Sequence, residues 1–284
     1  MDLNTAILLG LLEQQVENIL PTDLTNIAGQ VLTVSHGTTT ISYTVITTFY
    51  GNDLATDMNP ERGNQIVSFG AILQDTNKNV VIAIRGTDGI WEWVHDAEFL
   101  SVPCPFLASA GRTDDGFTAI YKSLKIAAAS TSLGVAQALA TLPPELNFNT
   151  PINSVTICGH SLGGALATLL ALDIAANTSF KNPTVYTYAS PRTGDPVFVT
   201  AYNGLSPNTS RIANRMDIVP KLPLPPQYEH VNTLFEINSV TIALPPKLLV
   251  KLDIGCEHHM TTYLYLLSLK GPGPVLPLDA DCAP

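Results

Sequence analysis

The sequence contains unusually little charge. Its 284 residues include 14 Lys and Arg and 24 Asp and Glu. Charged residues make up 13% of the chain, where an average soluble domain carries about 25%. So few cations exclude a nucleic-acid-binding protein, which needs a clustered basic surface. Because 45% of the residues are hydrophobic, a disordered chain is excluded as well. The composition predicts a soluble protein with a large core.

Long hydrophobic runs are also missing. A membrane-spanning helix needs roughly 18 consecutive apolar residues, but the best candidates, Ala6 to Leu12 and Leu162 to Ala176, are too short or are interrupted by polar residues. The chain begins Met1-Asp2, which is not the basic start of a signal peptide. We therefore expect no transmembrane segment. We expect a secreted protein whose leader has been removed, with a cytoplasmic protein as the alternative.

Cysteine is scarce, with four residues in the chain, so the fold does not depend on a disulfide framework. Cys158 ends an apolar run and is predicted to be a buried free thiol. Cys104, Cys256 and Cys282 lie beside prolines or in loops. One disulfide among these three is possible, and its pairing stays open.

Hydrophobic patterns predict strands that alternate with helices. The first half is expected to contain a helix over 2–20, strand-forming sequence over 31–50, a β-hairpin of 65–73 and 80–85, and a long helix over 116–142. The second half is expected to contain strands at 154–158, 184–189 and 209–213, and helices at 162–177, 195–203 and 260–270. This alternation implies an α/β fold with a parallel sheet, helices on both faces and antiparallel first strands. No repeat or linker divides the chain, so residues 1–284 are predicted to form one domain.

The pattern G-x-S-x-G occurs at Gly159, Ser161 and Gly163, between an apolar strand and a helix rich in small residues. This setting is what a nucleophile elbow requires, because the tight turn leaves little room two positions either side of the serine. The N-terminus of the following helix favours the negative charge that develops in acyl transfer. We therefore predict that Ser161 is a nucleophile. The alternative is a glycine-rich turn with a surface serine. His160 is predicted to be a packing residue, not a base.

A serine nucleophile needs a base and an orienting carboxylate, and in a fold of this type both follow the serine in the chain. Asp217 lies on a loop after the predicted strand 209–213, where such a carboxylate belongs. Asp173 lies inside the helix after the elbow and points the wrong way, and Asp195 is a predicted helix N-cap. Asp217 is therefore the predicted acid.

Three histidines follow Asp217, namely His230, His258 and His259. His230 follows closely and precedes another strand-like run. His258 and His259 precede the last predicted helix, where a returning loop can reach the end of the sheet, so one of them is the expected base. Adjacent histidines do not have a chelating spacing and no cysteine or histidine cluster accompanies them. We expect no metal and no other cofactor.

These motifs together resemble the class 3 (fungal-type) triacylglycerol lipase family of α/β hydrolases, from about Gln65 to Leu267. The strand ending in Arg85-Gly86-Thr87 is similar to the family's R-G-T or R-G-S, and the elbow 159–164 is similar to the family's elbow. Residues 188–196 are similar to the family's P-R-x-G-D segment, and residues 214–223 to the segment that carries the acid. Where the family often has H-x-G-F, this chain has Asp114-Asp115-Gly116-Phe117.

The resemblance implies a catalytic set of Ser161, Asp217 and His258, because many members place the base five residues before a tyrosine such as Tyr263. It implies an oxyanion hole formed by Thr87 and the N–H of Leu162.

The resemblance further implies a short mobile lid after Thr87, where both tryptophans of the chain lie. Ile90 and Trp91 would face a lipid surface, and Trp93 is expected in the core.

The function implied by the resemblance is hydrolysis of lipid esters, such as triacylglycerols, at a transient lipid–water interface. The apolar loops 222–226 and 244–250 could line an acyl pocket or contact lipid, or simply cross the sheet edge. A feruloyl or short-chain carboxylesterase shares every motif, and a lipid-binding module on a hydrolase fold is the non-enzymatic alternative. The absence of a basic cluster disfavours a phospholipase.

Overall fold

The computed structural model describes residues 1–53, 65–86, 99–128, 132–205, 207–241 and 255–282. The strands are β1 (Val31–His36), β2 (Thr39–Asp53), β3 (Gln65–Asp75), β4 (Asn79–Ile84), β5 (Ser101–Pro103), β6 (Arg112–Asp114), β7 (Lys125–Ile126), β8 (Ser154–His160), β9 (Thr184–Tyr188), β10 (Asn208–Asn214) and β11 (Leu234–Ile237). The helices are α1 (Leu3–Ile19), α3 (Asp115–Ser123), α4 (Val135–Thr141), α5 (Leu162–Asn177), α6 (Pro196–Gly204), α7 (Gly255–His258) and α8 (Met260–Ser268). Short 3₁₀ turns cover Pro144–Leu146, Val219–Lys221 and Ser239–Thr241.

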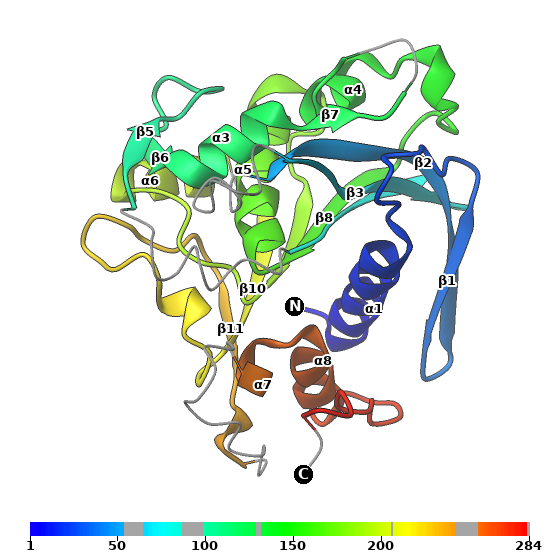
Figure 1. The fold of residues 1–284 in the computed structure, drawn as a ribbon, viewed down its shortest axis with the longest axis vertical. Helices are drawn as coiled ribbons and strands as arrows, with labels where there is room; N and C mark the ends of the chain where they lie inside the picture. The colour runs from blue at the N-terminus through cyan, green and yellow to red at the C-terminus, as the bar shows by residue number, and fades with distance from the viewer. Residues whose placement is uncertain (54–64, 87–98, 129–131, 206, 242–254, 283–284) are drawn as a thin grey trace.

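A single large sheet organises these elements, in the order β1-β2-β3-β4-β8-β9-β10-β11, with β7 paired to β2 (Figure 1). The strands from β4 to β11 along this order run parallel. The strands β1 to β4 pair antiparallel, and β5 and β6 form a separate ribbon. The prediction of a parallel sheet extended by antiparallel first strands is confirmed.

Two hydrophobic cores cover the two faces of the sheet, as β4 illustrates. Val80, Ile82 and Ile84 pack into the core shared with α3, α4, α5 and α6, whereas Val81 and Ala83 pack into the core shared with α1 and α8. Successive side chains of a strand point to opposite faces, so a strand covered on both sides has to be apolar at every position. Figure 1 shows α1 and α8 together on one side of the sheet and α5 on the other.

The helix α5 is buried on nearly all sides, with 13 of its 16 residues buried. It packs on β8 and β9 and is covered in turn by α3 and α4. A helix enclosed in this way is hydrophobic all round instead of amphipathic. Its position brings its N-terminus to the end of β8.

The long helix expected over 116–142 is wrong. The helix α3 ends at Ser123, and β7 then pairs with β2 through Phe49–Ile126 and Tyr50–Lys125. Helical structure resumes only at Val135, after Gly134. The alanine-rich sequence has helical propensity, but pairing with the exposed edge of β2 competes with it and extends the sheet. The expected strand over 31–50 is likewise two strands joined by a turn at Gly37.

The cysteines divide into one pair and two free thiols. Cys256 and Cys282 form a disulfide, which answers the pairing that the sequence leaves open. Cys158 is a buried free thiol, as predicted, and Cys104 is buried and free as well.

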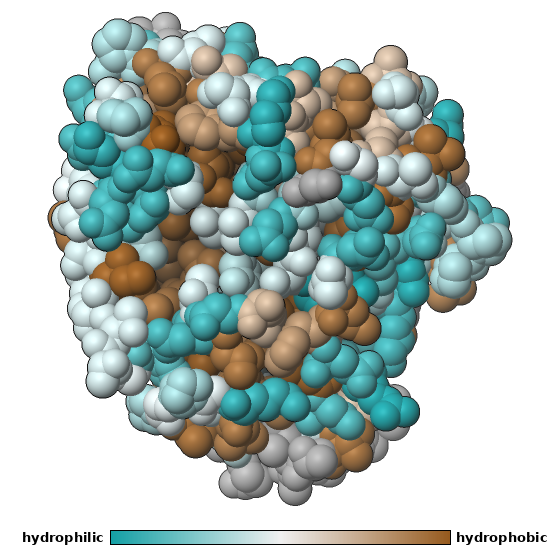
Figure 2. Space-filling view, turned by 180° about the vertical axis from the view of Figure 1, so that it is seen from behind, coloured by the Kyte–Doolittle hydropathy of each residue, from teal (hydrophilic) through white to brown (hydrophobic). Residues whose placement is uncertain are grey.

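The surface carries little charge. No helix among the described residues is long and apolar enough to cross a membrane. On the face turned away from the view of Figure 1, hydrophobic and hydrophilic residues are interspersed (Figure 2).

Candidate active site

Three side chains that lie far apart in the sequence meet at the carboxyl ends of the parallel strands. The Nε2 atom of His258 lies 2.9 Å from Ser161 Oγ. The Nδ1 atom of the same ring lies 2.8 Å from Asp217 Oδ2. All three residues are buried, with exposed fractions of 2% for Ser161, 5% for His258 and 1% for Asp217. This series has the geometry by which a carboxylate orients a histidine and the histidine contacts a hydroxyl.

The strand β8 positions Ser161 at a sharp turn into α5. Ser161 has φ 56° and ψ −125°, a conformation that a residue with a side chain rarely adopts and that costs about 1–3 kcal/mol. The turn is held by the Ser161 N–H, which donates to the Tyr188 carbonyl on β9. A Cβ atom on Gly159 would overlap the Gly163 carbonyl, and one on Gly163 would overlap the Ile84 carbonyl. The predicted need for glycine on both sides of the serine therefore follows from backbone contact.

The loop after β10 positions Asp217. Its Oδ1 accepts a hydrogen bond of 2.9 Å from the Val219 N–H. Its Oδ2 accepts one of 2.7 Å from the hydroxyl of Tyr263, and the same hydroxyl accepts from the Asn214 N–H at 3.0 Å. Burial is the largest cause that raises the pKa of Tyr263 well above its ordinary value, followed by the charge of Asp217. Tyr263 is therefore a neutral donor to the carboxylate at neutral pH.

His258, not its neighbour His259, is the histidine whose ring contacts Ser161 and Asp217. The Nδ1 of His259 instead lies 3.6 Å from Cys282 Sγ, one of the two sulfurs in the disulfide that closes two residues before His258. The third histidine, His230, lies 2.6 Å from the Pro220 carbonyl through Nε2. Among the described residues, no group of three or more His, Cys, Asp or Glu side chains could hold a metal ion.

Several other predicted residues lie where the sequence suggests or outside the description. Leu162 is the first residue of α5, so its N–H has no partner within the helix. Asp195 is the N-cap of α6 and accepts from Phe198 N–H at 2.7 Å. Asp173 bonds Tyr121 and Asn177 on the side of α5 away from the site. Thr87, the predicted lid residues Ile90 and Trp91, Trp93, and the loop 244–250 lie outside the described residues.

A family model described as lipase (class 3) matches residues 81–227, which is more than half of the 284-residue chain. The chain belongs to the class 3 lipase family. The matched segment contains the elbow and the acid loop, and His258 lies beyond it.

Curated relatives in this family come from plants and fungi. "Phospholipase A1-II 6" of Oryza sativa subsp. japonica is 29% identical over 232 residues, with 70% of this chain and 55% of the relative covered. "Secreted mono- and diacylglycerol lipase A" of Penicillium camembertii is 30% identical over 197 residues, with coverage of 68% and 60%. The chain spans about half the length of the curated relatives it matches.

Among solved structures, the triacylglyceride lipase of Rhizomucor miehei is 29% identical, with 59% of this chain and 61% of that chain covered and a TM-score of 0.48. A lipase from Penicillium cyclopium is 26% identical, with coverage of 69% and 64% and a TM-score of 0.48.

The segment that resembles the family's P-R-x-G-D motif braces the acid loop. The Arg192 N–H donates to the Leu222 carbonyl at 2.7 Å, and its guanidinium donates to the carbonyls of Lys221 and Pro223. Where the family often has histidine, Asp114 caps α3 by accepting from the Phe117 N–H at 3.1 Å.

A buried carboxyl lies behind the elbow, on the α1 side of the sheet. Glu13 is 0% exposed and neither of its oxygens has a hydrogen-bond partner. Burial raises the pKa of this carboxyl well above its ordinary value, and Glu17 raises it further. The Arg85 guanidinium and the backbone N–H of His160 act in the opposite direction. Glu13 is therefore held as a neutral acid over a wide pH range.

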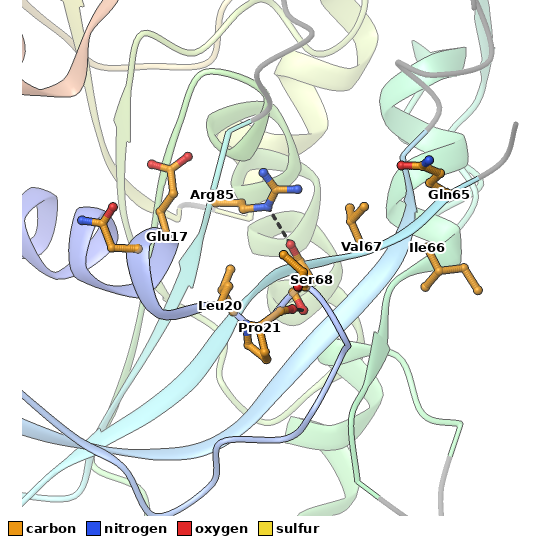
Figure 3. Close-up of a pocket in the computed structure, with 10 residues that line it drawn as sticks. Glu17, Leu20, Pro21, Gln65, Ile66, Val67, Ser68 and Arg85 are labelled. Atoms are coloured by element: carbon orange, nitrogen blue, oxygen red, sulfur yellow. Dashed lines mark hydrogen bonds between the residues drawn. The ribbon is translucent and has the colours of Figure 1, made fainter. Parts of the chain in front are cut away.

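A cavity of about 820 Å³ opens beside Arg85, at the end of α1 (Figure 3). The Arg85 Nε donates to the Ser68 carbonyl at 2.6 Å and its guanidinium lies 5.6 Å from the Phe69 ring. Glu17 lies on the opposite wall of the cavity from Val67 and Ile66 (Figure 3). Arg85 also adjoins the elbow, because a Cβ on Gly163 would lie 2.6 Å from the Arg85 carbonyl oxygen.

Sequence reasoning missed three residues of the site. Tyr263 serves only as a spacing marker in the sequence, yet its hydroxyl contacts the Asp217 carboxylate. Asn214 opens the acid segment, and its side chain bonds the Glu257 carbonyl beside the histidine. His160 was expected only to pack. The repeated signal was a polar residue at the end of a buried strand, which needs a partner wherever it is buried.

Proposed function

We propose that this chain is a serine carboxylic-ester hydrolase that acts on lipid esters, triacylglycerols in the first place, through an acyl-enzyme intermediate. The observation that carries the proposal is the series of hydrogen bonds from Asp217 through His258 to Ser161, at an elbow in a class 3 lipase. Acyl transfer from an ester needs these three groups in this order and no metal.

In the proposed reaction, Ser161 Oγ forms a bond to the ester carbonyl carbon while His258 Nε2 takes the hydroxyl proton. Asp217 holds the Nδ1–H tautomer and stabilises the imidazolium. The tetrahedral intermediate collapses, the carbon–oxygen bond to the alcohol breaks, and the alcohol leaves with the proton from Nε2. Water then gives a proton to Nε2, attacks the acyl-enzyme and releases the acid, and the proton returns to Ser161.

The negative oxygen of the intermediate needs donors beside the nucleophile. The N–H of Leu162 at the start of α5 is suited to this because the helix N-terminus also brings a positive dipole end. Thr87 follows Gly86, and a Cβ on Gly86 would lie 3.3 Å from Ser161 Cβ. We propose Leu162 and Thr87 as the two donors of the oxyanion hole.

A fluorophosphonate probe tests the nucleophile directly. We expect the native protein to be labelled and the Ser161→Ala variant to be inert, with the same folded far-UV spectrum. No labelling of the native protein would instead favour the lipid-binding module, which has no need of an activated serine.

The lipid substrate is supported by apolar side chains that are exposed beside the acid. Met216 and Ile218 flank Asp217 and are 48% and 42% exposed, and Leu224 on the following loop is 64% exposed. A lipid surface would cover such side chains favourably, at about 25 cal/mol for each Å² of apolar surface removed from water. We propose that this loop, with the predicted lid residues Ile90 and Trp91, meets the lipid–water interface.

A series of p-nitrophenyl esters from acetate to palmitate, with and without an emulsion, tests the substrate class. A lipase is expected to prefer medium or long chains and to gain rate when an interface forms. A sharp optimum at the shortest chains with no response to emulsion would support the short-chain esterase in its place.

Phospholipids are the second candidate substrate. The rice relatives are named as phospholipases A1, and the cavity beside the elbow carries the Arg85 guanidinium, which suits a phosphate group. This single placed cation weakens the earlier objection that the chain lacks a basic cluster. Release of fatty acid from the sn-1 position of phosphatidylcholine vesicles, measured beside triolein emulsion, ranks the two substrates.

We also propose that the protein is secreted. The Cys256–Cys282 disulfide is typical of oxidising compartments, and the Penicillium relative is named as secreted. Activity and protein measured separately in medium and cell extract of the native host test this, and a purely intracellular protein would contradict it.

A further inference from the structure

His160, the residue before the nucleophile, has a contact that packing alone does not require. Its Nε2 lies 2.8 Å from the main-chain carbonyl oxygen of His258. A carbonyl oxygen can only accept, so Nε2 carries the hydrogen and donates. The two imidazole rings lie with their centroids 4.7 Å apart. The ring of His160 therefore touches both the main chain and the side chain of the proposed base.

The next carbonyl along the chain is held in the same way from another strand. Asn214, at the end of β10, donates from Nδ2 to the Glu257 carbonyl at 2.9 Å. Asn214 is itself fixed, since its Oδ1 accepts from the Ser239 N–H at 3.0 Å. Consecutive carbonyls before and at the base are thus bound by side chains from the strand that leads to Ser161 and the strand that leads to Asp217.

We propose that His160 and Asn214 are positioning residues that hold the main chain of His258 in reach of both Ser161 and Asp217. The proposal rests on the ester-hydrolase function proposed above. The segment that carries His258 comes 97 residues after Ser161, and neither strand end continues into it. Two side-chain anchors connect that returning segment to the strand ends on which the other two groups stand. A displacement of the base by about 1 Å can cost roughly 100-fold in rate.

The neutral state of His160 suits this role. Burial of the ring, then the nearby His258, lowers the pKa of His160 well below its ordinary value. His160 therefore stays uncharged when His258 becomes an imidazolium beside it, and no repulsion between two cations opposes the proton transfer. The donor bond and the uncharged ring are both needed for a group in this position.

Three variants separate the donor from the bulk of the ring. His160→Phe keeps a flat ring and removes the donor. His160→Gln keeps a donor of similar reach. His36→Phe is the matched control, because His36 is also buried and its Nε2 lies 3.0 Å from a distant carbonyl, that of Pro274, away from the site. Each variant is assayed with a soluble p-nitrophenyl ester for kcat, KM and the pH dependence of kcat/KM.

We expect His160→Phe to lower kcat about 10- to 100-fold with KM changed less than about twofold. His160→Gln is expected to recover kcat to within about threefold of the native protein, and His36→Phe to lower thermal stability without changing kcat. Because the residue acts through His258, adding His160→Phe to a His258→Ala background should cost less than about twofold further.

Native kcat in His160→Phe would overturn the proposal, as would equal losses in the Phe and Gln variants or a full further loss on the His258→Ala background. If His160→Phe does not fold, His160→Ser replaces it, since serine is polar but too short to reach the His258 carbonyl. A native protein without esterase activity would contradict the proposed function itself, a result distinct from these outcomes.

Discussion

The buried carboxyl of Glu13 makes stability depend on pH in a direction that can be measured. The side chain lies 0% exposed in the core between α1 and the sheet, with no partner for either oxygen. The charged groups that bear on it are Glu17 and Arg85, with the neutral Cys158 and Tyr188 nearby. An ionised carboxylate there would lose its hydration without a hydrogen bond in return. The folded protein therefore holds Glu13 protonated.

The sign of the effect follows from the raised pKa. Unfolded, Glu13 ionises near its ordinary pKa of about 4.3, whereas the folded state keeps its proton to a much higher pH. Its contribution to stability is fully present below about pH 4 and is lost as the pH rises towards the folded pKa. In that interval the free energy of unfolding falls by about 1.4 kcal/mol for each pH unit because of this one group.

Urea unfolding at several pH values between about 5 and 8 measures this slope. We expect Glu13→Gln, which cannot ionise, to gain on the native protein by up to about 1.4 kcal/mol for each pH unit. Glu13→Met, which also removes the unpaired polar atoms, should be the more stable variant by about 1–3 kcal/mol. Glu236→Gln, at an exposed position on β11, is the matched control and should run parallel to the native protein. A difference between native protein and Glu13→Gln that stays constant with pH would refute the reasoning.

Three further perturbations follow from the contacts. Replacing Cys256 and Cys282 by serine opens a crosslink across 26 positions, and we expect a loss of about 3.5 kcal/mol in urea unfolding. Gly159→Ala should destabilise by about 3 kcal/mol or fail to fold, because its Cβ would overlap the Gly163 carbonyl, whereas Gly204→Ala has open space and should be neutral or gain up to about 1 kcal/mol; thermal melts of both compare them. Tyr263→Phe removes the 2.7 Å hydrogen bond to Asp217, and we expect kcat to fall about tenfold with KM unchanged, since a bond to a charged group is worth about 1.5–3 kcal/mol; steady-state kinetics on a soluble ester would contradict this if only KM changed.

Much of the fold could be predicted because local patterns and burial agree. The strand β4 is apolar at each position from Val80 to Ile84 because helices cover both of its faces, and the elbow is visible because backbone contact requires glycine at fixed positions. The helix 116–142 could not be resolved, since β7 forms only by pairing with β2 some 76 residues earlier. Such pairing leaves no local mark in a sequence of high helical propensity.

The site was predictable in its reactive groups and not in the groups that hold them. Ser161 and Asp217 lie in motifs whose residue types are dictated by chemistry. The choice between His258 and His259 depended on a spacing, because two adjacent residues differ only in which side of the chain they face. Tyr263, Asn214 and His160 act through hydrogen bonds to partners between 46 and 98 positions away, or 43 for the Asn214 amide. No single-sequence pattern specifies such partners.

The scarcity of charge has a consequence at the site itself. The side chains that contact the triad are a tyrosine hydroxyl, an asparagine amide and a histidine ring, and the tyrosine and histidine are held neutral by burial. None of these three offers a full positive charge to Asp217, so its negative charge is left to act on His258. In a buried site with low polarisability, that attraction is stronger than it would be in water. The imidazolium formed in the proposed reaction is therefore stabilised by a carboxylate whose charge these neighbours position without neutralising it.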